Sequence, residues 1–398
     1  MGPHNTAPAD LAALERAAAP FGQSRLLPQE CYTSPELFTW EMDHFYERSW
    51  VCAGRADELA RPGDQKAMRV GHDGILLVRD ENNSIRAFFN VCRHRAHELL
   101  APNQCAHARQ IRCPYHGWTY ALDGSLKVAP RSGGDSSEFC PGDFPLNPVR
   151  IEIWRGWVFV NLSDDAPPFT EWVGDLESLT APYEPERLRI GRSRSYEAAT
   201  NWKLVHENYH ECYHCPQIHP ELCRVTPPDS GDNLHMSGAW VGGIMDLAAG
   251  ATTMSFNGAG TAPALPGITG KKLRQVIYVG LLPNLFLSMH PDYIMTHRLE
   301  PLAHDRTRIE CNWLWPAGVV EAPGFSPDYA FDFWDVVNKQ DWVAIESVQR
   351  GISSRGYRPG TLAPKEDGVY RFIYRMARGY LDGGLSVAPL PAAVSPLL

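Results

Sequence analysis

Two short segments that each combine a cysteine with a histidine constrain this 398-residue chain more than any other feature. The first is Cys92-Arg93-His94, and the second, after 18 intervening residues, is Cys113-Pro114-Tyr115-His116. Two thiolates and two imidazoles form a complete set of four ligands, which suits either Zn²⁺ or a [2Fe–2S] cluster in which both histidines bind one iron. The chain is therefore expected to fold so that two loops meet at one metal site.

The way the ligands are shared favours the cluster over zinc. Each segment supplies one cysteine and one histidine, whereas zinc fingers more often pair cysteine with cysteine and histidine with histidine. Residues 117–124 follow as a strand and a turn, which is typical of a loop that projects from a sheet. Because the ligand set is complete, His97, Cys105 and His107 are expected to lie on the surface or to pack. A zinc-stabilised binding protein is the alternative.

A second group of candidate ligands lies in residues 201–220, which read NWKLVHENYHECYHCPQIHP. A helix over residues 201–214 would place Glu211 and His214 on one face. His219 lies five residues beyond His214, about 140° further around a helix. Both imidazoles can therefore meet one metal only if the helix ends between them, and Pro216 is well placed to end it.

The other histidines and cysteines of this region are expected to be structural. His206 and His210 are predicted to pack in the core or beside the ligands. In a cytosolic chain, ten cysteines indicate thiols and metal ligands before disulfides. The residues predicted to be core thiols are Cys212, Cys215 and Cys223.

A third ligand is expected from a distant helix. Two histidines and one carboxylate form the facial triad of non-haem iron oxygenases, which leaves positions open for O₂. Residues 327–351 are predicted to be helical, and Asp341 falls on a mostly apolar stripe, where an ionised side chain is costly unless it is paired or binds metal. Asp332 and Asp335 lie elsewhere on the helix and are expected to be solvated. The stripe also contains Trp334, Asn338, Ile345 and Val348.

The pattern along the chain predicts two domains of different character. Residues 46–163 alternate short apolar runs with Gly, Asp and Asn turns, which is typical of a small antiparallel β domain. Residues 1–45 and 164–398 mix helical periodicity with strand-like runs at 275–282, 293–299 and 307–315. The long irregular stretch 226–270 is rich in Gly, Pro, Ala and Ser, and such stretches often form a pocket wall or a lid.

At this point the sequence resembles a known family. The runs NVCRHR and RCPYHGWTY resemble the Rieske domain of bacterial ring-hydroxylating oxygenase α subunits, and residues 201–220 resemble the motif around their mononuclear iron. The resemblance implies an α+β fold with a small all-β Rieske domain and a larger helix-grip catalytic domain, an antiparallel sheet with helices. It also implies a set of site residues: Cys92, His94, Cys113 and His116 for a [2Fe–2S] cluster, His214, His219 and Asp341 for mononuclear Fe(II), Glu211 as an acid that bridges the two centres, and Asn208 beside the iron.

The resemblance further implies how such a chain works with others. The subunits of the family form a head-to-tail ring, usually a homotrimer, in which His116 of one subunit would bond Glu211 of the next. No Gly-rich nucleotide motif is present, so a separate NAD(P)H-dependent reductase is expected to supply the electrons. The chain is expected to be cytoplasmic and to bind neither a membrane nor nucleic acid, given its net charge of -9.

The substrate class is also suggested by resemblance. Residues 253–258 and 290–298 are similar to glycine betaine, choline and carnitine oxygenases, and members that act on quaternary amines tend to carry a glutamate where this chain has Glu211. The implied reaction is N-demethylation or hydroxylation of a methylated ammonium compound. The alternative is hydroxylation or O-demethylation of an aromatic ring, and the sequence leaves open whether one or both oxygen atoms are transferred.

Overall fold

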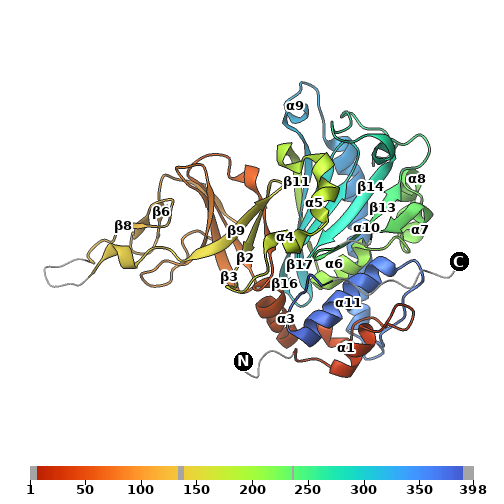
Figure 1. Cartoon of the computed structure of the whole chain (residues 1–398), viewed down its shortest axis with the longest axis horizontal. Coiled ribbons are helices and arrows are strands. Elements are labelled where there is room, and N and C mark those ends of the chain that lie inside the picture. The colour runs from red at the N-terminus through yellow and green to blue at the C-terminus, as the bar shows by residue number, and fades with distance from the viewer. Residues whose placement is uncertain (1–6, 133–138, 235–236, 389–398) are drawn as a thin grey trace. The chain divides into compact units, whose positions relative to one another are not determined.

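The computed structural model describes residues 7–132, 139–234 and 237–388. The chain divides into two compact units, one of residues 46–166 and the other of residues 1–45 together with 167–398 (Figure 1). Each unit has its own antiparallel sheet. This is the α+β arrangement that was expected, a small β domain and a larger domain of sheet and helices.

The smaller unit is built from β-strands. In its described part, one seven-stranded sheet has the order β1-β10-β9-β4-β3-β2-β5, and a three-stranded sheet has the order β6-β7-β8. The strands are β1 (Val51–Arg55), β2 (Asp64–Val70), β3 (Asp73–Arg79), β4 (Ile85–Phe89), β5 (Cys105–His107), β6 (Ile111–Arg112), β7 (Thr119–Tyr120), β8 (Leu126–Val128), β9 (Pro148–Trp154) and β10 (Trp157–Asn161).

A hydrophobic cluster connects the two sheets of this unit and carries the candidate metal loops. Leu76 of β3 and Phe88 of β4 pack in the same cluster as Trp118 and the two thiols of Cys92 and Cys113. In each Cys/His segment the cysteine is buried. The two loops therefore pack against the core through Cys92 and Cys113.

The larger unit contains a seven-stranded antiparallel sheet with the order β11-β17-β16-β15-β14-β13-β12. Its central strand β15 is buried at every position, which requires cover on both faces. The strands are β11 (Leu188–Ala198), β12 (Gly231–Asn233), β13 (Trp240–Asp246), β14 (Gln275–Leu281), β15 (Leu285–Met289), β16 (Ile294–Ala303) and β17 (Arg306–Pro316).

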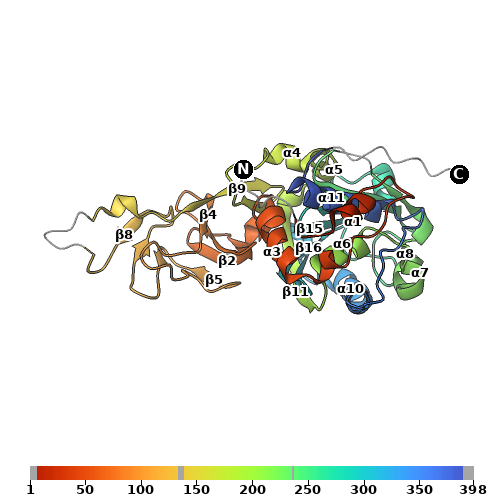
Figure 2. The ribbon, with the colours of Figure 1, turned by 90° about the horizontal axis from the view of Figure 1, so that it is seen from below.

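Helices pack on this sheet and on one another. Helix α6 contacts α10, α11 and strand β16, and α1 lies beside α11 (Figure 2). None of the helices in the described residues combines the length and the apolarity that a membrane crossing needs. The α-helices are α1 (Leu11–Ala17), α2 (Glu30–Thr33), α3 (Pro35–Glu41), α4 (Phe169–Val173), α5 (Leu176–Thr180), α6 (Trp202–Tyr209), α7 (Cys215–Ile218), α8 (Pro220–Val225), α9 (Ala317–Val320), α10 (Asp328–Ile352) and α11 (Asp367–Asp382).

Shorter helical turns complete the element list. Residues Met42–Tyr46 form a π-helical turn that continues α3. The 3₁₀ turns are Ala56–Glu58, Pro141–Asp143, Ala181–Tyr183, Pro185–Arg187, Pro228–Ser230 and Gly270–Arg274.

The helix predicted over residues 201–214 is wrong at its C-terminal end. Helix α6 stops at Tyr209, so Glu211 and His214 do not share a helical face. The carboxylate of Glu211 accepts hydrogen bonds from the backbone N–H groups of Tyr213 and His214, and such local bonds compete with helix formation. Pro216 lies in the first turn of α7, where its missing N–H costs nothing, so it begins a helix and does not end one.

Two smaller expectations on α10 are also wrong. Val348 is 45% exposed, because the buried stripe shifts by one position at this end of the helix and continues through Gln349. Asp335 is largely covered: it accepts a hydrogen bond from Tyr196 and pairs with Lys339. Asp332 is exposed, as expected.

A buried ion pair fixes α6 in place. Lys203 of α6 donates to Glu41 at 2.7 Å, and both side chains are almost fully buried. The same carboxylate accepts hydrogen bonds from Trp202 at 2.7 Å and from Tyr380 of α11 at 2.5 Å. With three donors on one carboxylate, the desolvated charges are fully paired, which is the condition under which a buried ion pair is tolerated. The pair links α6 to α3 and α11.

We expect Lys203→Met to destabilise the protein by about 3–5 kcal/mol, because it leaves the buried Glu41 charge without its cation. The measurement is the thermal unfolding midpoint of the purified protein. Lys339→Met is the matched control, since it removes an exposed lysine from its pair with Asp335, which keeps its hydrogen bond from Tyr196, and should cost less than about 1 kcal/mol. Equal shifts in the two variants would contradict the role given to the Glu41 pair.

Candidate metal centres

The two Cys/His segments of the smaller unit adopt closely similar loops. In the first, the N–H of Cys92 donates to the carbonyl of His97, and in the second the N–H of Cys113 donates to that of Trp118. The residue four positions after each cysteine has a positive φ, Ala96 at 57° and Gly117 at 74°. The two tight turns bring the four candidate ligands to one end of the unit.

Within these loops the thiols and the imidazoles lie in different environments. Cys92 and Cys113 are buried, whereas His94 and His116 are exposed, and the two imidazole rings lie 4.7 Å apart. The Cys113 sulfur accepts hydrogen bonds from the backbone N–H groups of Tyr115 and His116, and the Cys92 sulfur lies 3.3 Å from the Tyr120 hydroxyl. Donors aimed at sulfur are what a thiolate or a cluster sulfur needs.

The spacing of these four side chains fits a two-iron cluster better than one zinc ion. Four ligands of a single zinc at 2.0–2.3 Å would lie within about 4 Å of one another. Among the described residues, the one group of three or more possible ligands whose atoms all lie within 4.8 Å of one another is elsewhere. His97, Cys105 and His107 are exposed, as expected for residues outside the ligand set.

That compact group is His214, His219 and Asp341 of the larger unit. The structure brings the two histidines of the link between α6 and α8 against the carboxylate of α10. One Asp341 oxygen lies 2.9 Å from Nε2 of His219 and 3.5 Å from Nε2 of His214. His219 is buried, and His214 and Asp341 are mostly covered.

Hydrogen bonds on the far side of each imidazole show which nitrogen is available for a metal. Nδ1 of His219 donates to the side-chain oxygen of Gln340 at 2.7 Å, and Nδ1 of His214 donates to Glu211 at 2.5 Å. Both Nε2 atoms then direct a lone pair toward the Asp341 carboxylate. Three converging electron-pair donors are stable only with a cation between them, and this donor set suits non-haem Fe(II).

In the absence of a metal, the charge balance of the group is carried by a proton. Burial lowers the pKa of His214, but hydrogen bonds to Asp341 and Glu211 outweigh burial and raise that pKa to about 9. Burial raises the pKa of Asp341, but its hydrogen bonds to the two histidines outweigh burial and leave it below the usual value. A positively charged His214 therefore lies beside the Asp341 carboxylate. A divalent cation at the same place would interact more strongly with that carboxylate.

Glu211 and Asn208, the two residues expected beside the metal, both contact His214. Glu211 holds the backbone and the ring of His214, as described above, and 13% of its side chain is exposed. The Asn208 amide lies 3.4 Å from Nε2 of His214. The two residues therefore lie on opposite sides of the His214 imidazole.

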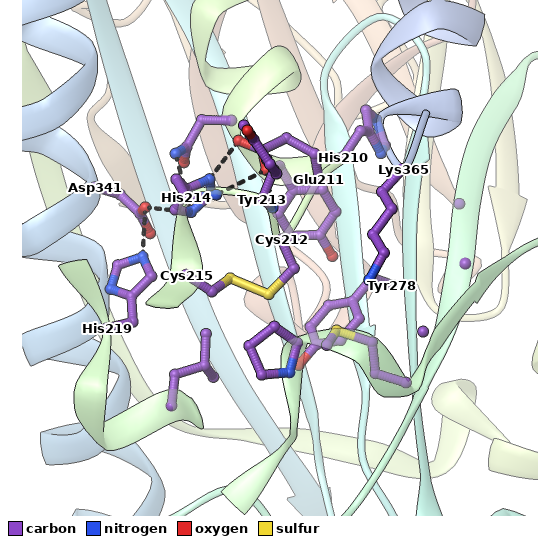
Figure 3. Close-up of a pocket in the computed structure, with 18 of the residues that line it drawn as sticks. His210, Glu211, Cys212, Tyr213, His214, Cys215, His219, Tyr278, Asp341 and Lys365 are labelled. Atoms are coloured by element: carbon purple, nitrogen blue, oxygen red, sulfur yellow. Dashed lines mark hydrogen bonds and ion pairs between the residues drawn. A yellow bond between two sulfur atoms is a disulfide. The ribbon is translucent and has the colours of Figure 1, made fainter. Parts of the chain in front are cut away.

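A cavity of about 940 Å³ reaches this group (Figure 3). Seven aromatic side chains line it, and so do two buried histidines, His210 and His297. Burial lowers the pKa of His210 to about 3 and that of His297 to about 4, so both rings are neutral near pH 7. The aromatic side chains of the lining are Phe21, Tyr209, Tyr213, Tyr278, Phe286, Trp334 and Trp342.

Carboxylates outnumber cations among the charged residues of the lining. Asp229 pairs with Lys365, and Asp367 pairs with Arg371 at 2.7 Å. The carboxylate of Asp232 accepts a hydrogen bond from the backbone N–H of Asn233 and is exposed. The electrostatic character of the described lining, metal group included, therefore favours a cation over an anion.

Several cavity residues were not identified from the sequence. Gly242, Gly243, Ile244 and Met245 belong to β13, a strand inside the stretch 226–270 that was expected to be irregular, and Tyr278 belongs to β14. Part of the stretch 226–270 therefore lines the cavity, as a pocket wall does. A period-2 pattern is absent from WVGGIMD, so no local signal pointed to it.

One expectation about the cysteines is wrong. Cys212 and Cys215 form a disulfide, and both line the cavity. Their Cα atoms lie 5.0 Å apart, within the range that a disulfide spans. Cys223 is a free thiol.

Comparison with known proteins places both units in families. Residues 49–139 match the Rieske [2Fe-2S] domain, and residues 185–382 match the ring hydroxylating alpha subunit, catalytic domain. The chain is a ring-hydroxylating oxygenase α subunit. It therefore carries a Rieske [2Fe–2S] domain and a catalytic domain that binds mononuclear iron, and it acts as an oxidoreductase that incorporates oxygen from O₂.

Named relatives of this α subunit are oxygenase components. The glycine betaine monooxygenase oxygenase subunit of Chromohalobacter salexigens is 30% identical over 376 residues, which cover 87% of this chain and 84% of the relative. The carnitine monooxygenase oxygenase subunit of Escherichia coli K12 is 30% identical over 336 residues, covering 83% and 85%. A solved quaternary ammonium Rieske monooxygenase is 25% identical, with a TM-score of 0.79 over 94% of this chain and 99% of that one.

We expect Gln340→Leu to lower the affinity of the α subunit for mononuclear iron about 10–100-fold, because His219 loses the acceptor that orients its ring. The measurement is competition with a chelator, with cluster iron followed separately by its visible absorption. Glu221→Gln is the control, since Glu221 contacts the other side of Gln340 and leaves the His219 bond in place. Unchanged iron binding in Gln340→Leu would show that this bond does not orient the ligand.

Proposed function

We propose that this α subunit is the oxygenase component of a multicomponent monooxygenase that oxidises a quaternary or methylated ammonium compound. The reaction is hydroxylation beside nitrogen, followed by loss of formaldehyde where a methyl group is attacked. The observation that carries the proposal is the aromatic, carboxylate-bearing cavity that ends at His214, His219 and Asp341. The relatives named for glycine betaine and carnitine support the same substrate class.

The metal-binding residues are assigned as part of this proposal. Cys92, His94, Cys113 and His116 hold the [2Fe–2S] cluster, and the converging histidines and Asp341 hold the iron. When bound, the cluster supplies single electrons and the iron supplies O₂ activation. The domains that we propose, residues 46–163 for the cluster and 1–45 with 164–398 for the iron, are supported by the two compact units.

The cavity suits a methylated cation for three reasons. Ring faces such as those of Tyr278 and Trp334 attract a methylammonium group that approaches within about 6 Å. The neutral forms of His210 and His297 add no opposing charge. The net negative charge of the described lining favours entry of a cation. Asn208, beside His214, is placed to orient the substrate or O₂ at the metal.

Glu211 is proposed to connect two subunits of a homotrimer. Its carboxylate already holds Nδ1 of one iron ligand, and a carboxylate with a second oxygen can accept from another imidazole. His116 is exposed and therefore available to a neighbouring chain. The solved quaternary ammonium monooxygenase is described with inter-subunit electron transfer. A proton shared along His116, Glu211 and His214 would couple the redox state of one centre to the other.

The reductase partner follows from the family, since the oxygenase subunits of these systems receive electrons from a separate protein. We propose that the pair works in the cytoplasm. Eight of the ten cysteines form no disulfide, which is typical of a reducing compartment.

The test is oxidation of candidate substrates by the purified protein with a reductase and NAD(P)H. Glycine betaine, carnitine, choline and trimethylated amines are compared with methoxylated and unsubstituted aromatic compounds. We expect substrate-dependent O₂ consumption, with formaldehyde or a hydroxylated amine, only in the first group. Turnover confined to the aromatic group would support the alternative, ring hydroxylation or O-demethylation. Protein with zinc and no iron would contradict both.

We expect Glu211→Gln to retain both metal centres but to slow electron transfer from cluster to iron by about 100-fold or more, because the amide keeps an acceptor for His214 and loses the charge and the proton-carrying oxygen. The measurement is single-turnover product formation by the reduced protein. Glu207→Gln, which changes a buried carboxyl bonded to Tyr32, is the control. A full single-turnover rate in Glu211→Gln would contradict the bridge.

A further inference from the structure

The Cys212–Cys215 disulfide closes a loop that contains an iron ligand. The bond joins residues three apart in sequence, and the two residues that it encloses are Tyr213 and His214. Figure 3 shows the disulfide beside His214 and Glu211. Residues 210–214 lie between α6 and α7, outside any helix. Contacts within this short link therefore help to position His214, together with Asn208 and Asp341.

Two constraints hold the link, and they act on different sides of His214. Glu211 bonds the backbone and ring of His214. The disulfide ties Cys212 to Cys215, the first residue of α7, where the backbone N–H of Cys215 also donates to the carbonyl of Cys212 at 3.2 Å. Loss of the disulfide removes the covalent constraint and leaves His214 held by the hydrogen bonds of Glu211 and by its contacts with Asn208 and Asp341.

The sulfur atoms are within reach of small molecules. Both cysteines line the cavity, and Cys212 is half-buried while Cys215 is buried. Tyr213 between them is 66% exposed. A small dithiol that enters the cavity can therefore attack the Cys212 sulfur. The other eight cysteines form no disulfide, and a single disulfide in such a chain is typical of a redox-active pair.

We propose that Cys212 and Cys215 form a redox-active pair that positions His214: the disulfide holds the iron ligand, and reduction to two thiols loosens it. The inference rests on the proposed function, since it takes His214 as an iron ligand. Reduction by a dithiol proceeds through a mixed disulfide and leaves two protein thiols and one disulfide in the reductant. Oxidation by hydrogen peroxide gives a sulfenic acid on one sulfur, and attack by the other thiol forms the disulfide, so that one peroxide yields two waters.

The chemistry of the proposed iron site suggests what the Cys212–Cys215 pair responds to. If two electrons from the reductase and two protons reduced O₂ here without oxidation of the substrate, hydrogen peroxide would form in the cavity that both cysteines line. Peroxide restores the disulfide and a cellular dithiol opens it, so the state of the pair reports the balance between the two. In the reduced form, two thiols lie beside the proposed iron ligand His214. Thiolates are soft ligands, and soft ligands favour zinc.

The experiment measures the cysteines and the iron separately. The holoprotein is treated with hydrogen peroxide or with a dithiol, freed of reagent, and alkylated for mass spectrometry. We expect the peptide containing residues 211–215 to gain two alkyl groups only after the dithiol. Iron release to a chelator is then followed, with the cluster monitored by its visible absorption. We expect mononuclear iron to leave the reduced form about tenfold faster, as when an orienting contact of a metal ligand is lost.

Two variants separate this role from general stability. The double variant Cys212→Ser with Cys215→Ser should release iron at the fast rate after either treatment. Cys223→Ser, which changes a free thiol on the neighbouring α8, should behave as the wild type. Iron that leaves both wild-type forms at the same rate, or a peptide alkylated equally after both treatments, would overturn the inference alone. Protein with iron only in its cluster would contradict the proposed function and this inference with it.

Discussion

The convergence of two imidazoles on the Asp341 carboxylate is the interaction around which the larger unit is arranged. The two histidines lie in one link and the carboxylate comes from a helix more than 100 residues later, so the three groups meet only if α10 packs against the link between α6 and α8. The Lys203–Glu41 pair holds α6 against α3, and Gln340 orients His219 from the same helix as Asp341. Without a metal ion, a proton on His214 offsets the negative charge of Asp341. The arrangement of the three groups therefore favours binding of a divalent metal ion.

Much of the site could be predicted because its signals are local. The two Cys/His segments give their ligand set directly, and the thiol and imidazole pairs lie together in the structure. Asp341 was identified because a charge on an apolar helical stripe needs a partner, and the structure supplies two histidines. The long helix 327–351 and the strands at 275–282, 293–299 and 307–315 were also found, because each carries a strong pattern of its own.

The errors have a common physical origin in contacts that a local pattern does not show. Helix α6 ends early because the Glu211 side chain bonds the backbone ahead of it. Strand β13 contains Gly242 and Gly243, which have low strand propensity, yet β14 pairs along its whole length. A Cβ at Gly242 would collide with the carbonyl of Tyr278, so the glycine is required by that close approach. The disulfide was missed because the cysteines of a cytosolic chain were expected to be thiols or metal ligands, and the sequence does not show which two sulfur atoms meet.

The uneven burial of the cluster loops has a consequence for electron traffic. The cysteines proposed as cluster ligands face the protein core and the proposed histidine ligands face outward, so a cluster held by them would have one covered side and one open side. An electron donor and an electron acceptor would both approach the histidine side, because the path to the cluster is shortest there. The two partners would therefore compete for one small edge, unless the donor uses a longer path through the loops. The order in which the electron donor and the electron acceptor bind at that edge would then affect the rate of turnover.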